Sequence, residues 1–423
     1  MISVDNNSMQ NIDVEAVWND SEEQELLMHT IHVYPAKFPA FIATKAFEYA
    51  ENEGVHIGKT ADIFCGCGTV ALEAKVHGKD FWGCDINPVA TLIAKTKSSS
   101  YDLMLLNQYY ESVKEGYQNE PSQNDVYSCA NNRLKYWYTE NSYIDLYKLK
   151  MLIEKEVPEG KYREAFLCLF SSILKTTSRW LTKSIKPQVD PNKEEKDVWN
   201  IFEKNYNKFI KAVDEIALLR NTKADIQIHT CNFLETNNAP NVDLIVSSPP
   251  YVTSYEYADL HQLSTLWLQY ADDYKKLRQG SIGSTYNSVN YSINHDLLNE
   301  VGRRIINDLE AGDASKAKIR AVARYYIDMQ SAVEKCACML NKGGMVFFVV
   351  GDTEYKGVQI LNSEHLIHSM INAGFRDIKA TKRTISKKML TPYRDAAGKF
   401  SSDKSNRTIY HEEYIITGRM WKN

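Results

Sequence analysis

The sequence predicts an α/β fold: a doubly wound mixed sheet with a helical insert and a C-terminal β-hairpin. Two observations favour this fold. Apolar segments of strand length alternate with helical patterns over residues 29–100, and the alternation resumes at residue 223. Residues 101–222 between them show helical spacing alone. We therefore expect one core formed by 29–100 and 223–423, interrupted by a helical insert at 101–222.

The composition is ordinary for a soluble globular protein of 423 residues, with 43% hydrophobic and 25% charged residues. The formal net charge of -4 means that a nucleic-acid surface would have to be a local patch. The apolar runs are too short to span a bilayer, and the acidic N-terminus differs from a signal peptide, so we expect a cytoplasmic protein. Neither Cys65-Gly-Cys67 nor Cys336-Ala-Cys338 has histidines at zinc spacing, so we expect no metal site.

A glycine-rich turn, Cys65-Gly-Cys-Gly-Thr69, follows the first predicted strand at 60–64 and precedes a helical pattern at 70–77. This order brings backbone amides and a helix N-terminus close to a ligand. The next predicted strand, 80–84, ends at Asp85, roughly twenty positions after the glycine turn. A carboxylate there suits two hydrogen bonds to ribose hydroxyls. Together these features favour a nucleoside-containing cofactor over a structural turn.

Two other segments have both a structural and a functional interpretation. Tyr34 and Lys37 lie between prolines before a predicted helix at 41–50, where they either cap the helix or contact a carboxylate ligand. Asn232 and Phe233 follow a predicted strand at 224–229. They form either a polar turn with a core phenylalanine or an amide and a ring that bind adenine.

The stretch Ser248-Pro-Pro-Tyr251 ends a short apolar strand at 244–246. Two prolines remove two backbone donors and prevent further strand pairing. A small polar residue and an aromatic residue beyond a strand end suit a site at the carboxyl edge of a sheet. The alternative is a proline-terminated strand with a core tyrosine.

Helices are expected in the insert at 101–118, 141–156, 162–185 and 199–219. Residues 174–186 contain four basic residues and no acidic residue, a charge of +4. They form either a solvated helix face or a surface that contacts phosphates.

After Tyr251 the sequence predicts helices at 255–270, 321–340 and 364–373, and strands at 345–350, 375–384 and 412–418. Residues 271–322 form a polar insertion, rich in small polar residues and tyrosines at 280–294, which is either a solvated excursion or a recognition surface. Residues 379–407 hold nine basic residues against two acidic ones, a charge of 9 − 2 = +7. This segment is either a phosphate-binding hairpin loop or a flexible basic loop.

These motifs resemble those of the S-adenosylmethionine-dependent amino-methyltransferases of DNA. Asp62-Ile-Phe-Cys-Gly-Cys-Gly-Thr69 looks like their cofactor loop, and Ser248-Pro-Pro-Tyr251 is similar to their catalytic motif in the form typical of N4-cytosine enzymes. His32-Val-Tyr-Pro-Ala-Lys-Phe-Pro39 resembles a segment that, in a subset of the family, helps to bind the methionine end of the cofactor. The resemblance covers most of 30–100 and 225–420.

The resemblance implies a Rossmann-like class I methyltransferase core, S-adenosylmethionine as the cofactor, and double-stranded DNA as the substrate. It also implies the modification half of a restriction-modification system, with the restriction endonuclease as a functional partner that does not bind this chain. We expect a monomer. The implied cofactor-binding residues are Tyr34, Lys37, Asp62, Phe64, Cys65, Gly66, Gly68, Thr69, Asp85, Ile86, Asn232 and Phe233. The implied catalytic residues are Ser248, Pro249, Pro250 and Tyr251, and the expected nucleic-acid contacts are Lys382, Arg383, Lys387, Lys388 and Arg394.

The chemistry of an exocyclic amine fits this motif. Its lone pair is delocalised into the ring, so acceptors on its hydrogens would direct that pair toward a methyl group. The Ser248 hydroxyl and the Pro249 carbonyl are both acceptors, and Tyr251 would stack on a flipped-out base. Methylation at carbon 5 of cytosine needs a cysteine nucleophile, usually after a proline, and the sequence has no Pro-Cys pair.

Three alternatives stay open: an N6-adenine DNA methyltransferase, an RNA base methyltransferase, and a catalytically silent nucleic-acid-binding protein. The intact Gly66, Gly68 and Ser248-Pro-Pro-Tyr251 disfavour the last of these.

Overall fold

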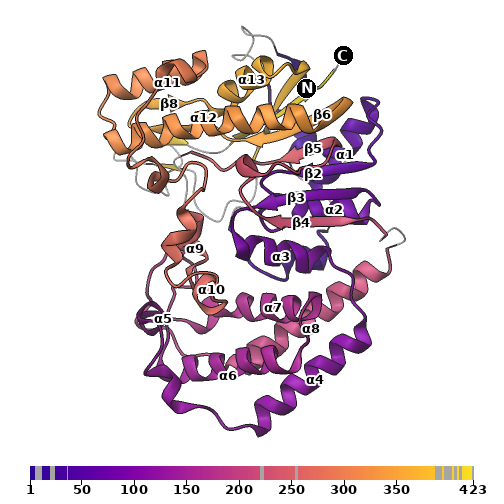
Figure 1. Ribbon diagram of the computed structural model, residues 1–423, viewed down its shortest axis with the longest axis vertical. Helices are drawn as coiled ribbons and strands as arrows, with labels where there is room; N and C mark the ends of the chain where they lie inside the picture. Colours follow the sequence, from indigo (N-terminus) through magenta and orange to yellow (C-terminus); the bar gives the residue numbers. More distant parts are fainter. Residues whose placement is uncertain are drawn as a thin grey trace.

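The computed structural model describes residues 1–4, 12–19, 24–35, 37–219, 223–252, 256–385, 393–394, 403, 407–408 and 412–421. Its centre is an eight-stranded mixed sheet in the order β1-β9-β12-β6-β5-β2-β3-β4 (Figure 1). The strands are β1 (Ile2–Ser3), β2 (Lys59–Asp62), β3 (Asp80–Asp85), β4 (Ile226–Thr230), β5 (Val242–Ser247), β6 (Leu340–Val350), β9 (Arg376–Thr384) and β12 (Glu412–Arg419). Two small antiparallel pairs accompany it: β7 (Thr353–Tyr355) with β8 (Val358–Ile360), and β10 (Tyr393–Arg394) with β11 (Arg407–Thr408).

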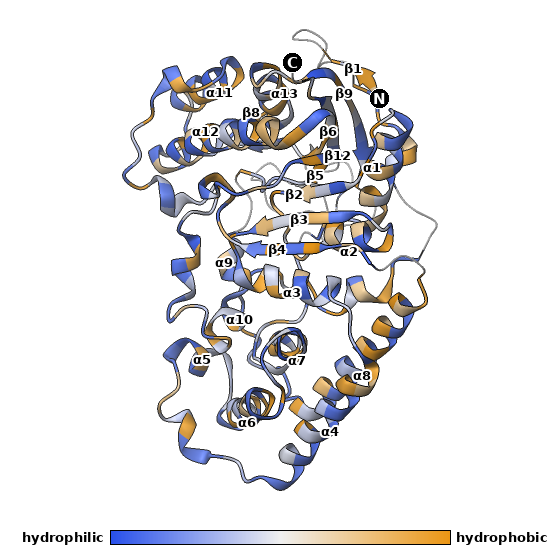
Figure 2. Ribbon diagram, turned by 45° about the vertical axis from the view of Figure 1, so that its right-hand side comes forward, coloured by the Kyte–Doolittle hydropathy of each residue, from blue (hydrophilic) through white to orange (hydrophobic). Residues whose placement is uncertain are grey.

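Strands β4, β3, β2, β5 and β6 run parallel, and β12 lies antiparallel between β6 and β9. The carboxyl ends of the parallel strands therefore meet at one edge of the sheet. In Figure 2 the arrowheads of β3 and β4 point to the side where α9 (Tyr257–Leu260) lies. The edge strand β4 is mostly hydrophilic in this view, which fits its exposed residues. The expected α/β fold with a doubly wound mixed sheet is confirmed.

The two faces of the sheet are covered by different helices. One face packs against α1 (Ala40–Asn52) and α2 (Thr69–Val76), and the other against α11 (Glu300–Ala311), α12 (Lys316–Met339) and α13 (Asn362–Asn372). Along β6 the side chains alternate between the two clusters: Phe347 faces α1 and Phe348 faces α12. Strands buried on both faces explain the continuous apolar runs in the sequence.

The helical insert consists of α4 (Leu103–Asn119), α5 (Asn132–Trp137), α6 (Glu140–Glu156), α7 (Lys161–Thr177) and α8 (Val198–Ala217). Figure 1 shows these helices stacked below the sheet, with α3 (Pro88–Ser98) between the insert and β4. Their hydrophobic cluster includes residues of α3 and of α10 (Gln262–Trp267). The insert thus continues the core instead of forming a separate unit.

Two expected helices are shorter in the structure. The pattern at 162–185 predicted one long helix, but α7 ends at Thr177. The buried Trp180 beyond it stacks on Trp137 at a ring distance of 5.0 Å and forms a β-bridge with Val189. The pattern at 255–270 predicted one helix, but α9 and α10 are separated at His261, whose φ of -103° and ψ of 11° are not helical. At the end of α7, the buried contacts of Trp180 replace further helical turns.

The 271–322 insertion is only partly the polar loop that its composition suggested. Its second half contains α11 and the first residues of α12, and Val301, Ile305 and Leu309 are buried in the core. Its first half has short 3-10 helices, including η6 (Tyr274–Arg278) and η7 (Thr285–Ser288).

Residues before the expected core boundary at 29 also take part in the fold. Strand β1 pairs with β9 at the edge of the sheet, with Ile2 opposite Ala380. Trp18 is buried against the rings of Tyr49 and Phe347. Among the residues described, no helix has the length and apolar character needed to cross a membrane.

Candidate functional site

The glycine turn after β2 lies at the carboxyl edge of the sheet and leads into α2. Gly66 and Gly68 have φ angles of 47° and 75°, which side chains rarely adopt. A Cβ atom at Gly68 would lie 2.6 Å from Cβ of Ala94 on α3, so only glycine fits there. The Gly66 amide donates a hydrogen bond to Oδ2 of Asp85 (2.9 Å). The expected loop, Cys65–Thr69, and the expected strand-tip acid are therefore in direct contact.

Two carboxyl groups lie at this turn: Asp62 is buried, and Asp85 is half-buried. Asp62 Oδ1 accepts hydrogen bonds from the Ser247 hydroxyl (2.6 Å) and the Phe64 amide (3.1 Å). Asp85 accepts from the Gly66 amide and, through Oδ1, from the Asn87 amide (2.8 Å). Burial raises the pKa of Asp62 to about 7, and repulsion from Asp85 adds to the effect. Burial also raises the pKa of Asp85, against the backbone hydrogen bonds.

These carboxyl groups fit S-adenosylmethionine. The hydrogen bonds they accept in the structure come from neutral donors. Asp62 Oδ1 accepts two of them, whereas each oxygen of Asp85 accepts one and has a further lone pair. S-adenosylmethionine carries a sulfonium, an ammonium group and ribose hydroxyls. A cation close to these carboxyl groups would lower their raised pKa values and favour the ionised forms. The ribose hydroxyls could donate hydrogen bonds to the Asp85 oxygens.

Tyr34 from the proline-framed segment forms one wall beside the turn. Its ring stacks on His261 with the centroids 4.9 Å apart, and it is the nearest group to the open side of Gly66. Burial lowers the pKa of His261 to about 3, so this ring is neutral. The wall is aromatic and uncharged. His261, which lies where α9 meets α10, was not among the expected site residues.

Lys37 does not face an open site in the structure. Its Nζ lies 2.6 Å from both carboxylate oxygens of Glu25 and 3.4 Å from the His29 carbonyl. A half-buried ammonium needs a counter-charge, and Glu25 supplies it. A contact between Lys37 and a cofactor carboxylate would require this pair to separate.

Asn232 and Phe233 match the structural interpretation of their turn. Asn232 Oδ1 accepts from the Leu234 amide (3.1 Å), and its Nδ2 donates to Glu235 (2.9 Å). Phe233 is 3% exposed and packs against Trp82. Gly280 lies next to this turn, and it was not among the expected site residues. A Cβ atom there would lie 2.8 Å from Ile86 and 3.6 Å from Asn232, so the insertion closes over these two expected cofactor residues.

The proline motif lies beside the turn because β5 and β2 are neighbours in the sheet. The Ser248 hydroxyl donates to the Val349 carbonyl on β6 (3.0 Å). Pro249 is buried, and Pro250 and Tyr251 are half-buried. The Tyr251 hydroxyl donates to Oε1 of Glu413 on β12 (2.7 Å). The fold thus brings the expected catalytic motif and cofactor turn to one sheet edge.

The expected nucleic-acid contacts are only partly described. Lys382 lies 3.8 Å from Glu412 and over the Tyr414 ring. Arg383 is 3% exposed with its Nε 3.6 Å from Glu413, so it is an interior cation, contrary to the expected surface contact. Lys387 and Lys388 lie outside the described residues, and Arg394 belongs to the short strand β10.

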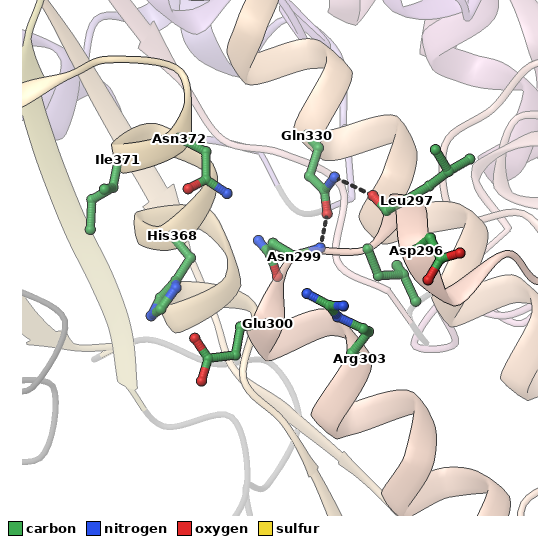
Figure 3. A pocket seen from close by; sticks show the side chains of 10 residues that line it. Asp296, Leu297, Asn299, Glu300, Arg303, Gln330, His368, Ile371 and Asn372 are labelled. Carbon is green, nitrogen blue, oxygen red and sulfur yellow. Dashed lines mark hydrogen bonds between the residues drawn. The ribbon is translucent and has the colours of Figure 1, made fainter.

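A separate cavity of about 420 Å³ lies between the start of α11 and the end of α13 (Figure 3). Gln330 bridges its wall by accepting from the Asn299 amide (2.9 Å) and donating to the Leu297 carbonyl (2.8 Å). Arg303 and His368 also line it. None of the expected site residues does, so this cavity is distinct from the sheet-edge site.

No protein-family model matches the chain. The chain is 23% identical over 362 residues to the Type II methyltransferase M.MvaI of Kocuria varians, with 79% of each chain covered. It is 22% identical to M.AvaI of Nostoc sp. over 74% of this chain and 72% of the relative. It is also 22% identical to M.BsoBI of Geobacillus stearothermophilus, over 78% and 75%. Both of these relatives are also named Type II methyltransferases.

Among solved structures, the rRNA methyltransferase aviRa from Streptomyces viridochromogenes aligns over 94% of this chain and 90% of its own, with a TM-score of 0.32 and 7% identity. A SAM-dependent methyltransferase from Methanosarcina mazei aligns over 93% and 100%, with a TM-score of 0.30 and 9% identity. The sequence relatives support the expected class of enzyme, a Type II methyltransferase that uses S-adenosylmethionine. Chain length and motif order also suggested a narrower resemblance to the BamHI modification methylase. The sequence relatives do not support that narrower resemblance.

Proposed function

We propose that this protein is a site-specific DNA methyltransferase that transfers a methyl group from S-adenosylmethionine to the N4 amine of a cytosine flipped out of duplex DNA. It would act as the modification half of a restriction-modification system. The relatives named Type II methyltransferases support the enzyme class. The geometry of Ser248 supports the amine as the target.

The main support for an amine target is the hydrogen bonding of Ser248, whose hydroxyl has only one hydrogen. That hydrogen points to the Val349 carbonyl at 3.0 Å. The oxygen lone pairs therefore remain for an amine hydrogen, and the Pro249 carbonyl supplies a second acceptor without a competing amide donor. Two acceptors on one amine favour a tetrahedral nitrogen whose lone pair is free to attack. Ser248 acts as an acceptor and does not form a covalent bond.

The cofactor would lie along the glycine turn. Asp85 would accept from the ribose hydroxyls, Asp62 would face positive charge, and the Tyr34 ring would form the wall beside Gly66. When bound, S-adenosylmethionine supplies an electrophilic methyl group. The acceptors at Ser248 and Pro249 would hold the amine hydrogens, so that the amine nitrogen faces this methyl group. The nitrogen–methyl bond would form as the sulfonium–methyl bond breaks, and the amine would release one proton to solvent. Tyr251 would stack on the base.

The test is incubation with labelled S-adenosylmethionine and duplex DNA, followed by nucleoside analysis. We expect label in N4-methylcytosine. Label in N6-methyladenine would replace the proposal by its nearest alternative, because adenine presents a similar amine to the same acceptors. Label confined to RNA would overturn the DNA substrate.

A further inference from the structure

Tyr251 is held from a part of the chain that the motifs do not include. Its hydroxyl donates to Oε1 of Glu413 at 2.7 Å, although 162 positions separate the two residues. Glu413 lies near the start of β12, beside the end of β6, where the chain reaches Gly351. The contact therefore crosses the carboxyl edge of the sheet from the loop after β5 to β12.

A second charged group lies behind Glu413. Arg383 is its partner in the register of β9 and β12, and its Nε lies 3.6 Å from Oε2 of Glu413. The guanidinium is buried over the Phe41 ring, and within the described part of the chain its Nε and Nη1 have no hydrogen-bond partner. A buried cation that makes so few hydrogen bonds keeps its place only beside an opposite charge. Glu413 is thus held by Arg383 and in turn accepts from Tyr251.

The ring of Tyr251 is also positioned by Gly351. A Cβ atom at this residue would lie 3.0 Å from Cε2 and 3.3 Å from Cζ of the ring. The φ angle of Gly351 is not in the left-handed region, so the backbone conformation does not require glycine. Glycine is needed here because a side chain would collide with the Tyr251 ring. Burial and the negative charge of Glu413 raise the pKa of Tyr251, so the hydroxyl keeps its hydrogen as a donor.

We propose that Glu413, backed by Arg383, is a positioning residue that fixes the ring of Tyr251 for stacking on the extruded base. This inference rests on the proposed function. It assigns the basic residue Arg383 to the support of the catalytic motif and not to contact with DNA phosphates. Glu413 acts through Tyr251 and does not touch the substrate.

Removing Glu413 alone would leave Arg383 as an unpaired buried charge and strongly destabilise the protein, so a lower rate would not report on Tyr251. The informative variant is therefore the pair Arg383→Met with Glu413→Met, which removes the acceptor and the charge together. It is compared with Tyr251→Phe, which removes the donor and keeps the ring. Single-turnover methyl transfer and duplex affinity are measured on DNA that the wild-type protein methylates.

We expect the paired methionine variant and Tyr251→Phe each to slow single-turnover transfer by about tenfold, with the Kd for DNA changed by less than about threefold. Combining them should slow transfer no further, because both remove the same hydrogen bond. Gly351→Ala should slow transfer because it displaces the ring.

Glu412→Gln is the matched control, since neighbouring residues of a strand face opposite sides and Glu412 pairs with Lys382. It should leave the transfer rate within about twofold. Losses that multiply to about a hundredfold in the combined variant, or an unchanged rate in the paired variant, would overturn the inference. A wild-type protein that transfers no methyl group to DNA would overturn the proposed function instead.

Discussion

The Ser247 hydroxyl donates a 2.6 Å hydrogen bond to Oδ1 of Asp62. Ser247 is the last residue of β5, next to the Ser248-Pro-Pro-Tyr251 motif, and Asp62 is the last residue of β2, next to the glycine turn. Both side chains are buried. One hydrogen bond therefore connects the strand that ends in the proposed catalytic motif to the strand that ends in the proposed cofactor turn.

The raised pKa of Asp62 predicts a pH dependence of cofactor binding. Burial raises this pKa to about 7, so below pH 7 the carboxyl group is largely neutral, and above it is ionised. A cationic ligand binds the ionised form better, so we expect the affinity for S-adenosylmethionine to rise as the pH rises through about 7. Titration calorimetry from pH 5.5 to 8.5 measures this. Asp62→Asn should flatten the profile, and an equally steep profile in that variant would assign it to another group.

The same group also affects stability, with the opposite sign. Between the unfolded pKa of about 3.9 and the folded value of about 7, the folded state binds more protons than the unfolded state. The contribution of Asp62 to the free energy of unfolding therefore falls as the pH rises from about 4 to 7. We expect Asp62→Asn to have little effect on the urea midpoint at pH 4 and to raise it at pH 8. An equal shift at both pH values would contradict this.

Ser248→Ala tests the acceptor role. Loss of one transition-state acceptor should lower turnover by about 10- to 1000-fold, with the Kd for S-adenosylmethionine retained. Rapid-quench kinetics with labelled cofactor gives the transfer rate, and calorimetry gives the Kd. Unchanged turnover would remove Ser248 from the catalytic residues.

Gly68→Ala should destabilise the protein by more than the cost of its backbone conformation. Its φ of 75° alone costs about 1 kcal/mol, and the new Cβ atom would lie 2.6 Å from Ala94. Gly54→Ala is the matched control, because Gly54 has a φ of 81° and no atom within 4 Å of an added Cβ. We expect the larger fall in the free energy of unfolding for Gly68→Ala in urea titrations. Equal falls would show that the turn yields to accommodate a side chain.

The basic stretch at 174–186 gives a prediction about DNA affinity. Lys175 and Arg179 donate to backbone carbonyls and hold the loop, whereas Lys183 and Lys186 are exposed. If the loop contacts phosphates, Lys183→Glu with Lys186→Glu should weaken DNA binding and reduce its salt dependence. Lys204→Glu with Lys211→Glu on α8 makes the same charge change elsewhere on the insert. Equal losses in both variants would indicate a general charge effect.

Local pattern was sufficient for much of the fold and for part of the site. The glycine turn and its contact with Asp85 could be predicted from Gly66, Gly68 and their spacing to Asp85, because strand, turn and helix are consecutive in the chain. The predicted helix length was wrong where a contact with a distant residue ends the helix, as the stacking of Trp180 on Trp137 does beyond α7.

Contacts between distant segments had no local signal. Glu413 follows a basic segment and looks like an ordinary strand residue, and its role depends on the antiparallel placement of β12 between β6 and β9. Arg383 was predicted as a nucleic-acid contact because charge alone does not distinguish a buried cation with a partner from an exposed one. Lys37 was predicted as a ligand contact for the same reason, since Glu25 approaches it only in the folded chain.

Strand β12 is the last of the sheet in the chain, yet it lies between β6 and β9. Until residues 412–419 leave the ribosome, β9 and the N-terminal β1 have no connection to the rest of the sheet. A chain released early therefore lacks both the strand that joins β9 to β6 and the Glu413 contact to Tyr251. We therefore expect a chain that stops before β12 to lack a competent site.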